Sequence, residues 1–260
     1  MLISGITNCQ YIVLNLQNYK KMAKVALITG SAVRLGRAIV LHLAEAGWDL
    51  ALHYRASSGA ISELEAELKS SFPDQRFHSF QTDFSSIDQT ENFVDQVIKQ
   101  FGQLDLLVNS SSVFEPGSFK ETTADKLIQH SIVNFVAPFI LMRDFANKSI
   151  NGLIINIVDT RITNNNSDHL SYSLSKKSLW ELTKMAALEL APHFRVNAIA
   201  PGAILAPVGK DQSYLEKVAS NTPMKTPSGV ISVLKSIDYI IVNEDLTGQL
   251  LFCDGGAHII

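Results

Sequence analysis

Cysteine is scarce in this sequence, which contains only Cys9 and Cys253 among its 260 residues. The two thiols lie near opposite ends of the chain without metal-type spacing, so the sequence predicts neither a disulfide framework nor a zinc site. The seven histidines are scattered and form no His-Glu-x-x-His pattern. We therefore expect a protein without a metal, in a reducing compartment such as the cytoplasm.

Long apolar runs and a strong excess of one charge are also absent. No apolar run approaches the ~18 residues that a membrane-spanning helix needs. The formal net charge is −3, which gives no broad attraction to nucleic acid or to an anionic membrane. With 46% hydrophobic and 18% charged residues, the composition is that of an ordinary globular protein. Neither nucleic acid nor a membrane is an expected partner.

The first 23 residues lack the features of a signal peptide. They have no basic start ahead of an apolar stretch, and polar residues interrupt the apolar ones. We interpret residues 1–23 as an N-terminal extension outside the fold, and translation from Met22 is the alternative. Residues 24–260 are then expected to form a single domain.

From residue 24 onward, short apolar runs alternate with segments of helical pattern. The strand-like runs lie at about 25–29, 49–53, 77–81, 104–109, 153–158, 195–200 and 249–253. The helix-like segments lie at about 35–46, 60–70, 87–101, 123–147, 172–191 and 229–242. Nearly continuous apolar runs are expected when helices cover both faces of a parallel sheet. The alternation predicts a doubly wound α/β fold.

Residues 202–228 interrupt this alternation. They contain Pro207, Pro223 and Pro227 and little strand pattern. Because they follow the sixth strand-like run, we expect a loop-and-helix insertion near the carboxyl edge of the sheet, where a substrate lid would belong.

The segment TGSAVRLG, residues 29–36, joins the first strand-like run to the first helix-like segment. Gly30 permits a tight turn and Gly36 permits close packing at the helix start, so backbone N–H groups can face a pyrophosphate. A purely structural turn is the alternative, since many strand–helix turns contain glycine. An arginine, Arg34, stands where the middle glycine of a G-x-G-x-x-G-like turn is expected.

The second strand-like run ends in LALHYRASS, residues 50–58. Folds that bind NAD place an acidic residue about 20 residues beyond the glycine turn, where it holds the ribose 2′-hydroxyl. Here that region carries His53, Tyr54, Arg55 and Ser57, and no carboxylate. An arginine with nearby hydroxyls can hold a 2′-phosphate, which favours NADPH over NADH. The alternative is that Arg55 is an ordinary surface charge.

Tyr172 and Lys176 are four residues apart in a helix-like segment and therefore lie on the same helical face. A free phenol has a pKa of about 10. A nearby ammonium favours the phenolate, so we expect Lys176 to lower the pKa of Tyr172. Such a pair can supply a proton to a substrate under reduction. The alternative is a pair without function on the helix surface.

A set of motifs resembles the short-chain dehydrogenase/reductase family. The motifs are TGSAVRLG, NSSS at residues 109–112, Asn134, Tyr172-x-x-x-Lys176 and VNAIAPG at residues 196–202. They occur in the family's order, and the resemblance extends over residues 24–260. It implies a seven-stranded Rossmann-like sheet with helices on both faces, a homotetramer, and catalytic roles for Asn134, Tyr172 and Lys176.

The sequence departs from the common family pattern at the catalytic serine, where it has Asp159. An ionised carboxylate would repel the alkoxide of a ketone under reduction. It can accept from N–H groups of a nitrogen heterocycle or, when protonated, donate to one. Asp159, Arg34 and NSSS together resemble the pteridine reductase branch. The segments SDHLSYSLSK, MKTPSG and DGGAHI are similar to bacterial dihydromonapterin/dihydrofolate reductases of that branch.

The resemblance implies an NADPH-dependent reductase that adds a hydride to C6 and a proton to N5 of a dihydropterin. Dihydromonapterin, dihydrofolate and dihydrobiopterin are substrates of this kind. It assigns NADPH to Gly30, Arg34, Leu35, Gly36, His53, Tyr54, Arg55, Ser57, Asp83, Phe84, Asn109, Ser110, Ser111, Tyr172, Lys176, Pro201, Gly202 and Ile204. It assigns the pterin to Arg34, Ser111, Val113, Phe114, Asp159 and Tyr172.

The assignments of Asn134, Asp83 and Val113 each carry a further expectation or an alternative. Asn134 is expected to support a water relay, and the alternative for Asp83 is a helix N-cap. Val113 stands where the related reductases have an aromatic residue that stacks on the pterin. Either Phe114 takes that role from a shifted loop, or the stacking is weaker.

Two other functions are alternatives. The first is an NADPH-dependent carbonyl or ketoacyl reductase of the same family, which Asp159 argues against because the ketone oxygen would lack a hydroxyl donor. The second is a non-catalytic NADP-binding regulator, which the intact pair of Tyr172 and Lys176 argues against.

Overall fold

The computed structural model describes residues 24–206, 209 and 211–260. The predicted N-terminal extension, the alternative start at Met22, and the residues Cys9 and Pro207 lie outside the described residues. Within the described part of the chain, no helix has both the length and the apolar character of a membrane span.

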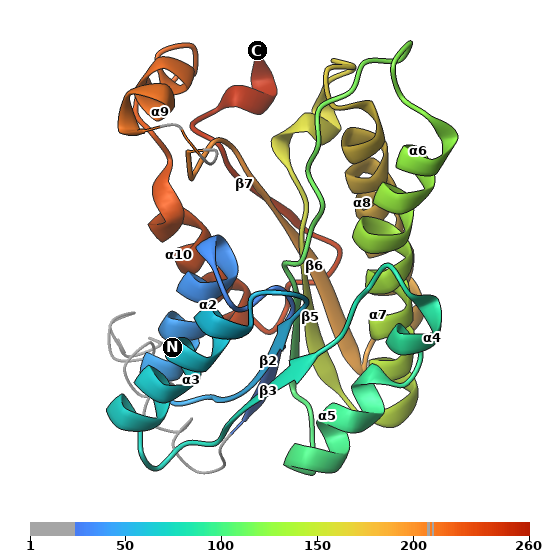
Figure 1. Ribbon diagram of the computed structural model, residues 1–260, viewed down its shortest axis with the longest axis vertical. Helices are drawn as coiled ribbons and strands as arrows, with labels where there is room; N and C mark the ends of the chain where they lie inside the picture. Colours follow the sequence, from blue (N-terminus) through green and yellow to red (C-terminus); the bar gives the residue numbers. More distant parts are fainter. Residues whose placement is uncertain (1–23, 207–208, 210) are drawn as a thin grey trace, which may run out of the picture.

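The strands of the described chain form one parallel sheet of seven (Figure 1). They are β1 (Val25–Ile28), β2 (Asp49–Tyr54), β3 (Phe77–Gln81), β4 (Leu106–Asn109), β5 (Gly152–Ile157), β6 (Phe194–Pro201) and β7 (Leu250–Cys253). Their order is β3-β2-β1-β4-β5-β6-β7, and every neighbouring pair is parallel. This confirms the predicted fold class. The order reverses between β1 and β4, where such sheets bind their ligands.

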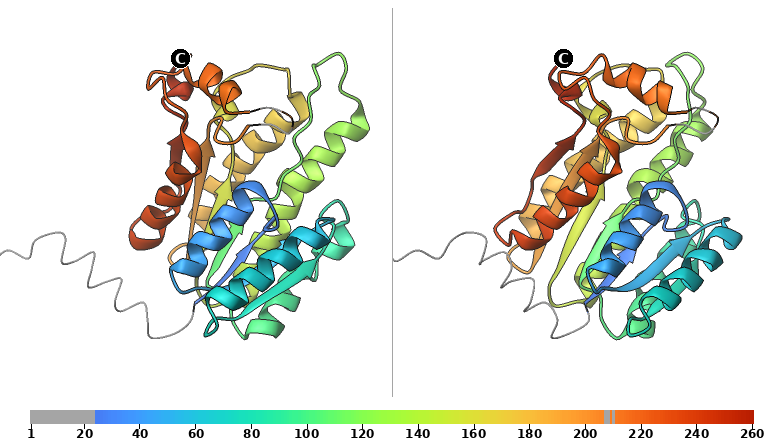
Figure 2. Two further views of the ribbon diagram at one scale, coloured as in Figure 1. Left: turned by 60° about the vertical axis from the view of Figure 1, so that its left-hand side comes forward. Right: turned by 90° about the vertical axis from the view of Figure 1, so that its left-hand side faces the viewer.

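Helices cover both faces of the sheet, as Figures 1 and 2 show. One face carries α2 (Arg34–Glu45), α3 (Ser58–Ser71) and α10 (Gly229–Val242). The other carries α4 (Ile87–Thr90), α5 (Phe93–Phe101), α6 (Ala124–Ser131), α7 (Ala137–Lys148) and α8 (Leu170–Leu190). The predicted two-sided covering is confirmed.

The central strand β1 explains why the sheet is buried on both sides. All four of its residues are fully buried. Ala26 and Ile28 belong to the hydrophobic core under α2, α3 and α10, whereas Val25 and Leu27 belong to the core under α5 and α7. Successive side chains of a strand point to opposite faces, so an uninterrupted apolar run supplies both cores.

The helix predicted over residues 123–147 is interrupted. Between α6 and α7 the residues Ile132–Val136 form a π-helical turn, η2, with Asn134 at its centre. Pro138 follows four residues after Asn134 and has no N–H, so the Asn134 carbonyl lacks the donor that a regular α-helix would supply. The break therefore falls at a residue of the predicted site, as π turns often do.

The helix predicted over residues 87–101 is also divided, into α4 and α5. The chain turns between them at Glu91 and Asn92. Asparagine favours turns and caps over helix interiors because its side chain competes for backbone hydrogen bonds. The apolar pattern continued through the turn, so periodicity alone did not reveal it.

The segment 202–228 lies at the carboxyl edge of the sheet (Figure 1). Its described part includes the helix α9 (Gln212–Ala219), which Figure 2 shows beside the C-terminal residues. The segment therefore contains both loop and helix, and its role as a substrate lid stays a prediction.

Replacing Gly36 by alanine is expected to lower the free energy of unfolding by at least about 2 kcal/mol, because an added atom must push backbone apart. A Cβ atom at Gly36 would lie 2.0 Å from the Gly30 carbonyl oxygen. Urea denaturation measures the loss. Gly59→Ala in α3 is the matched control, since its Cβ would meet nothing within 4 Å. Equal stability of the two variants would contradict the prediction.

Candidate active site

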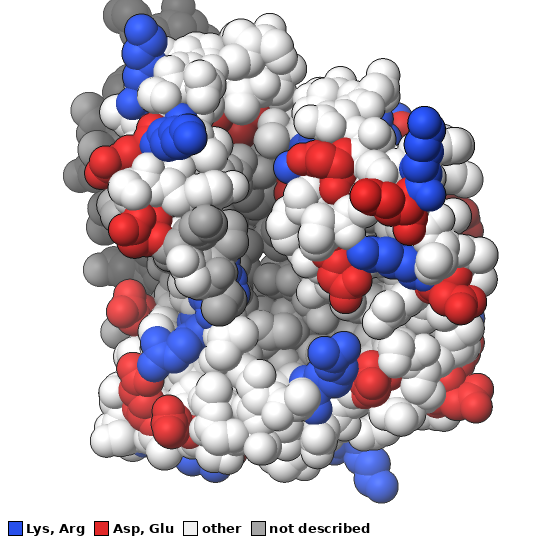
Figure 3. Space-filling model, turned by 45° about the horizontal axis from the view of Figure 1, so that its top comes forward, with Lys and Arg blue, Asp and Glu red and all other residues white. Residues whose placement is uncertain are grey.

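The carboxyl edge of the sheet is the face to which most of the predicted site residues belong. Seen from this side, the surface is hollowed in its middle, and side chains of both charges surround the hollow (Figure 3). Among the described residues, no three His, Cys, Asp or Glu side chains are grouped to hold a metal ion.

The turn after β1 is compact because glycine allows close backbone contacts there. Gly30 has a φ of 71°, and its N–H donates to Nδ1 of His53 at 3.0 Å. A Cβ atom on Gly30 would lie 3.1 Å from the Cα of Ser111. Helix α2, which follows, has no side-chain cap at Val33 and no acidic residue in its first turn. Its first N–H groups are thus left for an anion, which fits the pyrophosphate of a dinucleotide.

Arg34 connects this turn to the segment after β6. Its backbone has a φ of 54°, in the left-handed region that non-glycine residues seldom adopt. Its Nη2 group donates to the Ala206 carbonyl at 3.0 Å and lies 3.5 Å from the Leu205 carbonyl. The guanidinium has five N–H donors, so others remain for a phosphate or a substrate. The structure therefore places Arg34 between the predicted cofactor turn and the predicted lid.

His53 supports the turn from inside the protein. Because Nδ1 accepts the Gly30 N–H, Nε2 carries the proton and donates to the Thr82 carbonyl at 3.0 Å. The ring stacks on Phe84 with 3.9 Å between centroids and is buried. Burial lowers the pKa of His53 to about 4. The side chains of His53 and Phe84 thus support the wall of the predicted cofactor site.

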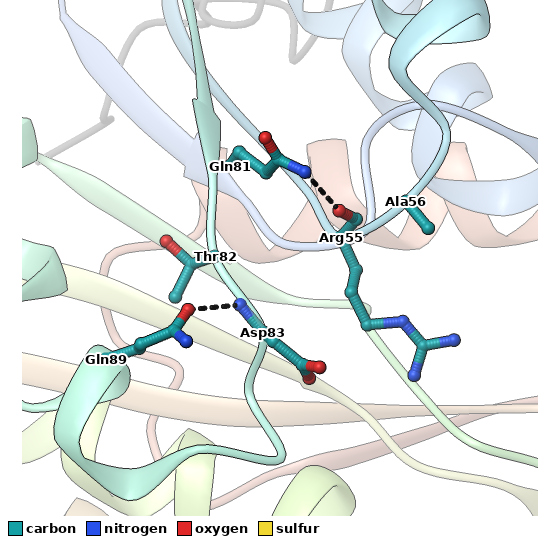
Figure 4. Close-up of a pocket in the computed structure, with 6 residues that line it drawn as sticks. All are labelled: Arg55, Ala56, Gln81, Thr82, Asp83 and Gln89. Carbon is teal, nitrogen blue, oxygen red and sulfur yellow. Dashed lines mark hydrogen bonds between the residues drawn. The ribbon is translucent and has the colours of Figure 1, made fainter.

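Two adjoining hollows lie beside the turn, at the ends of β2 and β3. One of about 240 Å³ is lined by Gly30, Ala32, Val33, His53, Tyr54, Arg55, Ala56, Ser57, Asp83, Phe84, Ser111, Ser112, Val113 and Val133. One of about 510 Å³ is lined by Arg55, Ala56, Gln81, Thr82, Asp83 and Gln89 (Figure 4). Together they bring many of the predicted cofactor residues around one space. The side chains of Leu35 and Tyr54 pack against the core; Tyr54 lines the smaller hollow, and Leu35 lines neither.

Arg55 and the start of α3 offer donors to a phosphate. Arg55 is exposed, and Figure 4 shows its side chain extending to the same side of the hollow as that of Asp83. Ser57 occupies the N-cap position of α3 without making a side-chain cap, and no acidic residue follows in the first turn. A guanidinium, a hydroxyl and uncapped N–H groups therefore lie next to one another in sequence, as an anion site requires.

Asp83 is held within its own turn. Its carboxylate accepts the Ser85 N–H at 2.9 Å. That hydrogen bond, with the positive charge of Arg55 adding to it, holds the pKa of Asp83 below its ordinary value. The N-cap of α4 is Ser86, which accepts the Gln89 N–H. The alternative of a helix cap for Asp83 is therefore wrong.

The NSSS segment after β4 is tied to β1 and β5. Thr29 Oγ1 accepts the N–H groups of both Ser110 and Ser111 at 2.9 Å. Asn109 donates from Nδ2 to Asn156 Oδ1 at 2.8 Å, while its own buried Oδ1 has no hydrogen-bond partner. Thr29 and Asn156 were not among the predicted residues. Thr29 opens the glycine-rich motif, which was the available signal.

Tyr172, Asp159 and Lys176 meet at the end of β5. The Tyr172 hydroxyl donates to Asp159 Oδ2 at 2.8 Å, and the Arg161 N–H donates to Asp159 Oδ1 at 2.8 Å. Lys176 Nζ donates to the Ile157 carbonyl at 2.8 Å and lies 5.8 Å from the centroid of the Tyr172 ring. Burial raises the pKa of Asp159 and lowers the pKa of Lys176 to about 8.

The expected lowering of the pKa of Tyr172 is wrong for this arrangement. Burial first, and then the charge of Asp159 and the hydrogen bond to it, raise the pKa of Tyr172 well above its ordinary value. The phenolate is disfavoured beside a carboxylate, whereas the Lys176 ammonium is turned to a backbone carbonyl. The hydroxyl therefore stays protonated and can act as a proton donor.

Asn134 holds the chain beside this group. Its Oδ1 accepts the Val113 N–H at 2.8 Å and the Ser112 hydroxyl at 3.2 Å. Its Nδ2 donates to the Val113 carbonyl at 2.9 Å and to Ser175 Oγ at 3.0 Å. These four bonds use every position of the amide, which leaves none for water. The geometry supports a positioning role for the Asn134 side chain.

Phe114, and not Val113, presents an aromatic face next to Tyr172. Phe114 is 51% exposed, with its ring edge-on to Tyr172 at a centroid distance of 4.6 Å. It also stacks on His169 at 4.3 Å. The Asn134 side chain forms hydrogen bonds with the backbone N–H and carbonyl of Val113. His169 was not predicted, because its contact depends on two loops that are distant in sequence.

The residues after β6 lie against the end of β7. The Gly202 N–H donates to the Cys253 carbonyl at 3.0 Å, and a Cβ atom on Gly202 would lie 2.9 Å from the Cα of Asp254. Pro201 is buried as the last residue of β6, and Ile204 packs against the core. Asp254 itself was not predicted, although it begins the DGGAHI segment that carried part of the resemblance.

Comparison with known proteins gives a consistent result. A family model described as short chain dehydrogenase matches residues 24–216. Dihydromonapterin reductase from Shigella boydii serotype 4 is 28% identical over 240 residues, which cover 90% of this chain and 96% of that protein. FolM alternative dihydrofolate reductase 1 from Brucella canis, crystallised with NADP, is 31% identical with a TM-score of 0.84 and covers 91% of this chain and 95% of its own. Acetoin dehydrogenase YohF from Salmonella typhimurium is 27% identical with a TM-score of 0.83, covering 92% and 97%.

These similarities confirm the resemblance drawn from the motifs and the fold that it implies. They agree on an oxidoreductase that uses a nicotinamide dinucleotide. They differ in the substrate, since two of the three proteins are named for pterin or folate reduction and the third for acetoin.

The neutral His53 makes stability depend on pH. Its pKa is 6.5 in an unfolded chain and about 4 in the fold, so only the unfolded chain holds the proton between those values. The stability that neutral His53 contributes is present above pH 6.5 and is lost as the pH falls toward 4. From about pH 7 to about pH 4.5 we expect His53 to account for a loss of about 2 kcal/mol in unfolding free energy.

Urea denaturation of the wild type and of His53→Gln at both pH values isolates this effect. Glutamine keeps an amide near the ring position but does not titrate. The variant should therefore lose about 2 kcal/mol less than the wild type over the same range. Parallel losses in the two proteins would contradict the assignment of this pH dependence to His53.

Proposed function

The chain belongs to the short-chain dehydrogenase/reductase family, and we propose that it is an NADPH-dependent reductase that converts a dihydropterin to its tetrahydro form. The observation that carries the proposal is the partly buried hydrogen bond from Tyr172 to Asp159. It puts a carboxyl group where a carbonyl reductase needs a neutral hydroxyl donor. A nitrogen heterocycle can use such a carboxyl group, both as an acceptor for ring N–H groups and as an acid.

NADPH is the cofactor that the residues around β2 fit. The uncapped start of α2 suits a pyrophosphate, and Arg55, Ser57 and the uncapped start of α3 suit a 2′-phosphate. Asp83 is the one carboxylate among the described residues that line the two hollows, and it is already bonded to Ser85. When bound, NADPH supplies the hydride.

Tyr172 is the proton donor in this proposal. Burial keeps its hydroxyl protonated, and the Asp159 carboxylate orients that hydroxyl. Lys176 is buried behind the ring with a pKa of about 8, so it can return a proton near neutral pH. In a dihydropterin, the proton goes to N5 while C6 receives the hydride.

Asp159, Arg34 and Phe114 account for a flat, nitrogen-rich substrate. The Asp159 carboxylate can accept from a ring N–H group, and burial raises its pKa, which favours uptake of a proton. Phe114 offers a half-exposed aromatic face beside Tyr172, on which a pterin can stack. The unused donors of Arg34 form a planar fork that matches the polar edge of a pterin or a cofactor phosphate.

A carbonyl reductase is the second candidate, because the similarity to an acetoin dehydrogenase covers nearly the whole chain. A non-catalytic NADP-binding regulator is the third, and the ordered Tyr172, Asp159 and Lys176 argue against it. The homotetramer that the family resemblance implies and the cytoplasmic location that the scarcity of cysteine favours also stay predictions.

Oxidation of NADPH by a panel of substrates tests the proposal. We expect turnover with dihydromonapterin, dihydrofolate or dihydrobiopterin, and little with simple ketones such as acetoin. Tyr172→Phe should reduce turnover at least about 100-fold and preserve NADPH binding, since it removes only the proton donor. Good turnover of ketones without turnover of any pterin would reject the proposal. Undiminished biological activity of Tyr172→Phe would favour the regulator.

Replacing Arg55 by alanine should weaken NADPH binding roughly 10–100-fold, because a charge-assisted hydrogen bond to the 2′-phosphate is lost. Binding of NADH, which lacks that phosphate, should change by less than about twofold. Fluorescence titration with both cofactors measures the difference. Arg76→Ala is a control, since Arg76 pairs with Asp49 at the opposite end of β2. An equal loss for NADPH and NADH would contradict the role of Arg55.

A further inference from the structure

Asp254 is a buried carboxylate at the end of β7 that the proposed mechanism does not use. It accepts the Thr160 hydroxyl at 2.6 Å and the N–H groups of Gly256 at 2.9 Å and His258 at 2.8 Å. The ring Nδ1 of His258 lies 2.9 Å from the same carboxylate. Burial opposes ionisation, yet these hydrogen bonds hold the pKa of Asp254 below its ordinary value. A carboxylate with so many donors has one orientation and can fix the groups around it.

Thr160 connects this anchor to Asp159. Thr160 is the first residue of the short helix η3 (Thr160–Thr163), and Asp159 is its N-cap. The Asp159 carboxylate accepts the Arg161 N–H, and the Thr163 hydroxyl donates to the Thr160 carbonyl at 2.9 Å. Because the Asp159 carboxyl is bonded into η3, the position of Thr160 determines where that carboxyl lies.

Asp254 also touches the segment that is expected beside the nicotinamide. A Cβ atom on Gly202 would lie 2.9 Å from the Asp254 Cα and 3.0 Å from its Cβ, so the segments that contain Gly202 and Asp254 are in direct contact there. Asp254 therefore lies where the proton-transfer side of the site meets its cofactor side. The short helix η4 (Ala257–Ile259) follows it and packs near η3.

We propose that Asp254 and Thr160 are positioning residues that hold the Asp159 carboxyl in place against substrate and cofactor. The kinetic consequence rests on the proposed function, because Asp159 bears on the rate only where it contacts the substrate. Neither residue contacts the reacting atoms, and the effect passes through Asp159. Loosening Asp159 slows hydride transfer, since small misplacements in a site are costly. NADPH affinity is expected to depend on the residues around β2 and to stay unchanged when Thr160 is replaced.

The test compares Thr160→Val with Thr160→Ser in the full-length protein. Valine has nearly the shape of threonine without the hydroxyl, and serine retains the hydroxyl. Single-turnover oxidation of NADPH by 7,8-dihydrobiopterin should be about tenfold slower in Thr160→Val and within about twofold of wild type in Thr160→Ser. The NADPH Kd and the Tm should match the wild type in both variants.

Asp254→Asn tests the anchor itself. Both carboxylate oxygens accept hydrogen bonds, so either orientation of an amide would turn a donor against a donor. The same loss of rate is expected, and the double variant Thr160→Val/Asp254→Asn should be no slower than the slower single variant. If Asp254→Asn does not fold, the two Thr160 variants decide the question.

Hydrogen–deuterium exchange tests the link without a substrate. Peptides that cover residues 159–164 should exchange about fivefold faster in Thr160→Val and at the wild-type rate in Thr160→Ser. A protein that reduces no pterin would overturn the proposed function, and the exchange measurement would then decide on the link alone. The inference would be overturned if Thr160→Val matched Thr160→Ser both in deuterium exchange and in the rate of hydride transfer. It would also be overturned if the losses of rate from the two single variants added up in the double variant.

Discussion

The hydrogen bond between Tyr172 and Asp159 is the interaction on which the rest of the site depends. It joins helix α8 to the residues after β5 and places two weak acids side by side, of which Tyr172 is buried and Asp159 is partly buried. Burial raises the pKa of both groups, and the carboxylate of Asp159 raises the pKa of Tyr172 further, whereas the hydrogen bond from Tyr172 favours the ionised form of Asp159. The site therefore retains a proton between them at neutral pH. The other groups of the site, which include the Asn134 side chain and the half-exposed ring of Phe114, determine what can approach that proton.

The predicted cofactor end and the predicted substrate end of the site are held by different means. At the predicted cofactor end, backbone N–H groups and a neutral histidine shape the turn, in which Arg34 is the one charged residue. At the substrate end, charged or titratable groups are fixed by bonds to strand ends that are far apart in sequence. Arg34 is the side chain that spans both, since it leaves the turn and reaches the segment after β6. The doubly wound sheet makes this possible because all its carboxyl ends meet at one edge.

The sequence predicted the fold well because the strands are buried on both faces. An uninterrupted apolar run such as Val25–Ile28 fits a central strand, because such a strand supplies apolar side chains to the cores on both faces of the sheet. It failed for the π turn at Asn134, although Pro138 was a local signal, because an amphipathic pattern continues through a one-residue shift. It placed Tyr172 and Lys176 together but gave the pKa of Tyr172 the wrong direction. That direction is determined by burial and by the partner that the hydroxyl chooses, and spacing encodes neither.

The way in which His53 supports the glycine turn has a consequence for how cofactor choice can evolve. The residue that shapes the turn points inward from β2, whereas Arg55, two positions later, points outward. Shape and selectivity are therefore assigned to separate side chains of one short stretch. If Arg55 binds the 2′-phosphate as proposed, an exchange at this outward position would change the preference for a dinucleotide while the turn around His53 stays intact, so the two traits could be inherited and selected independently.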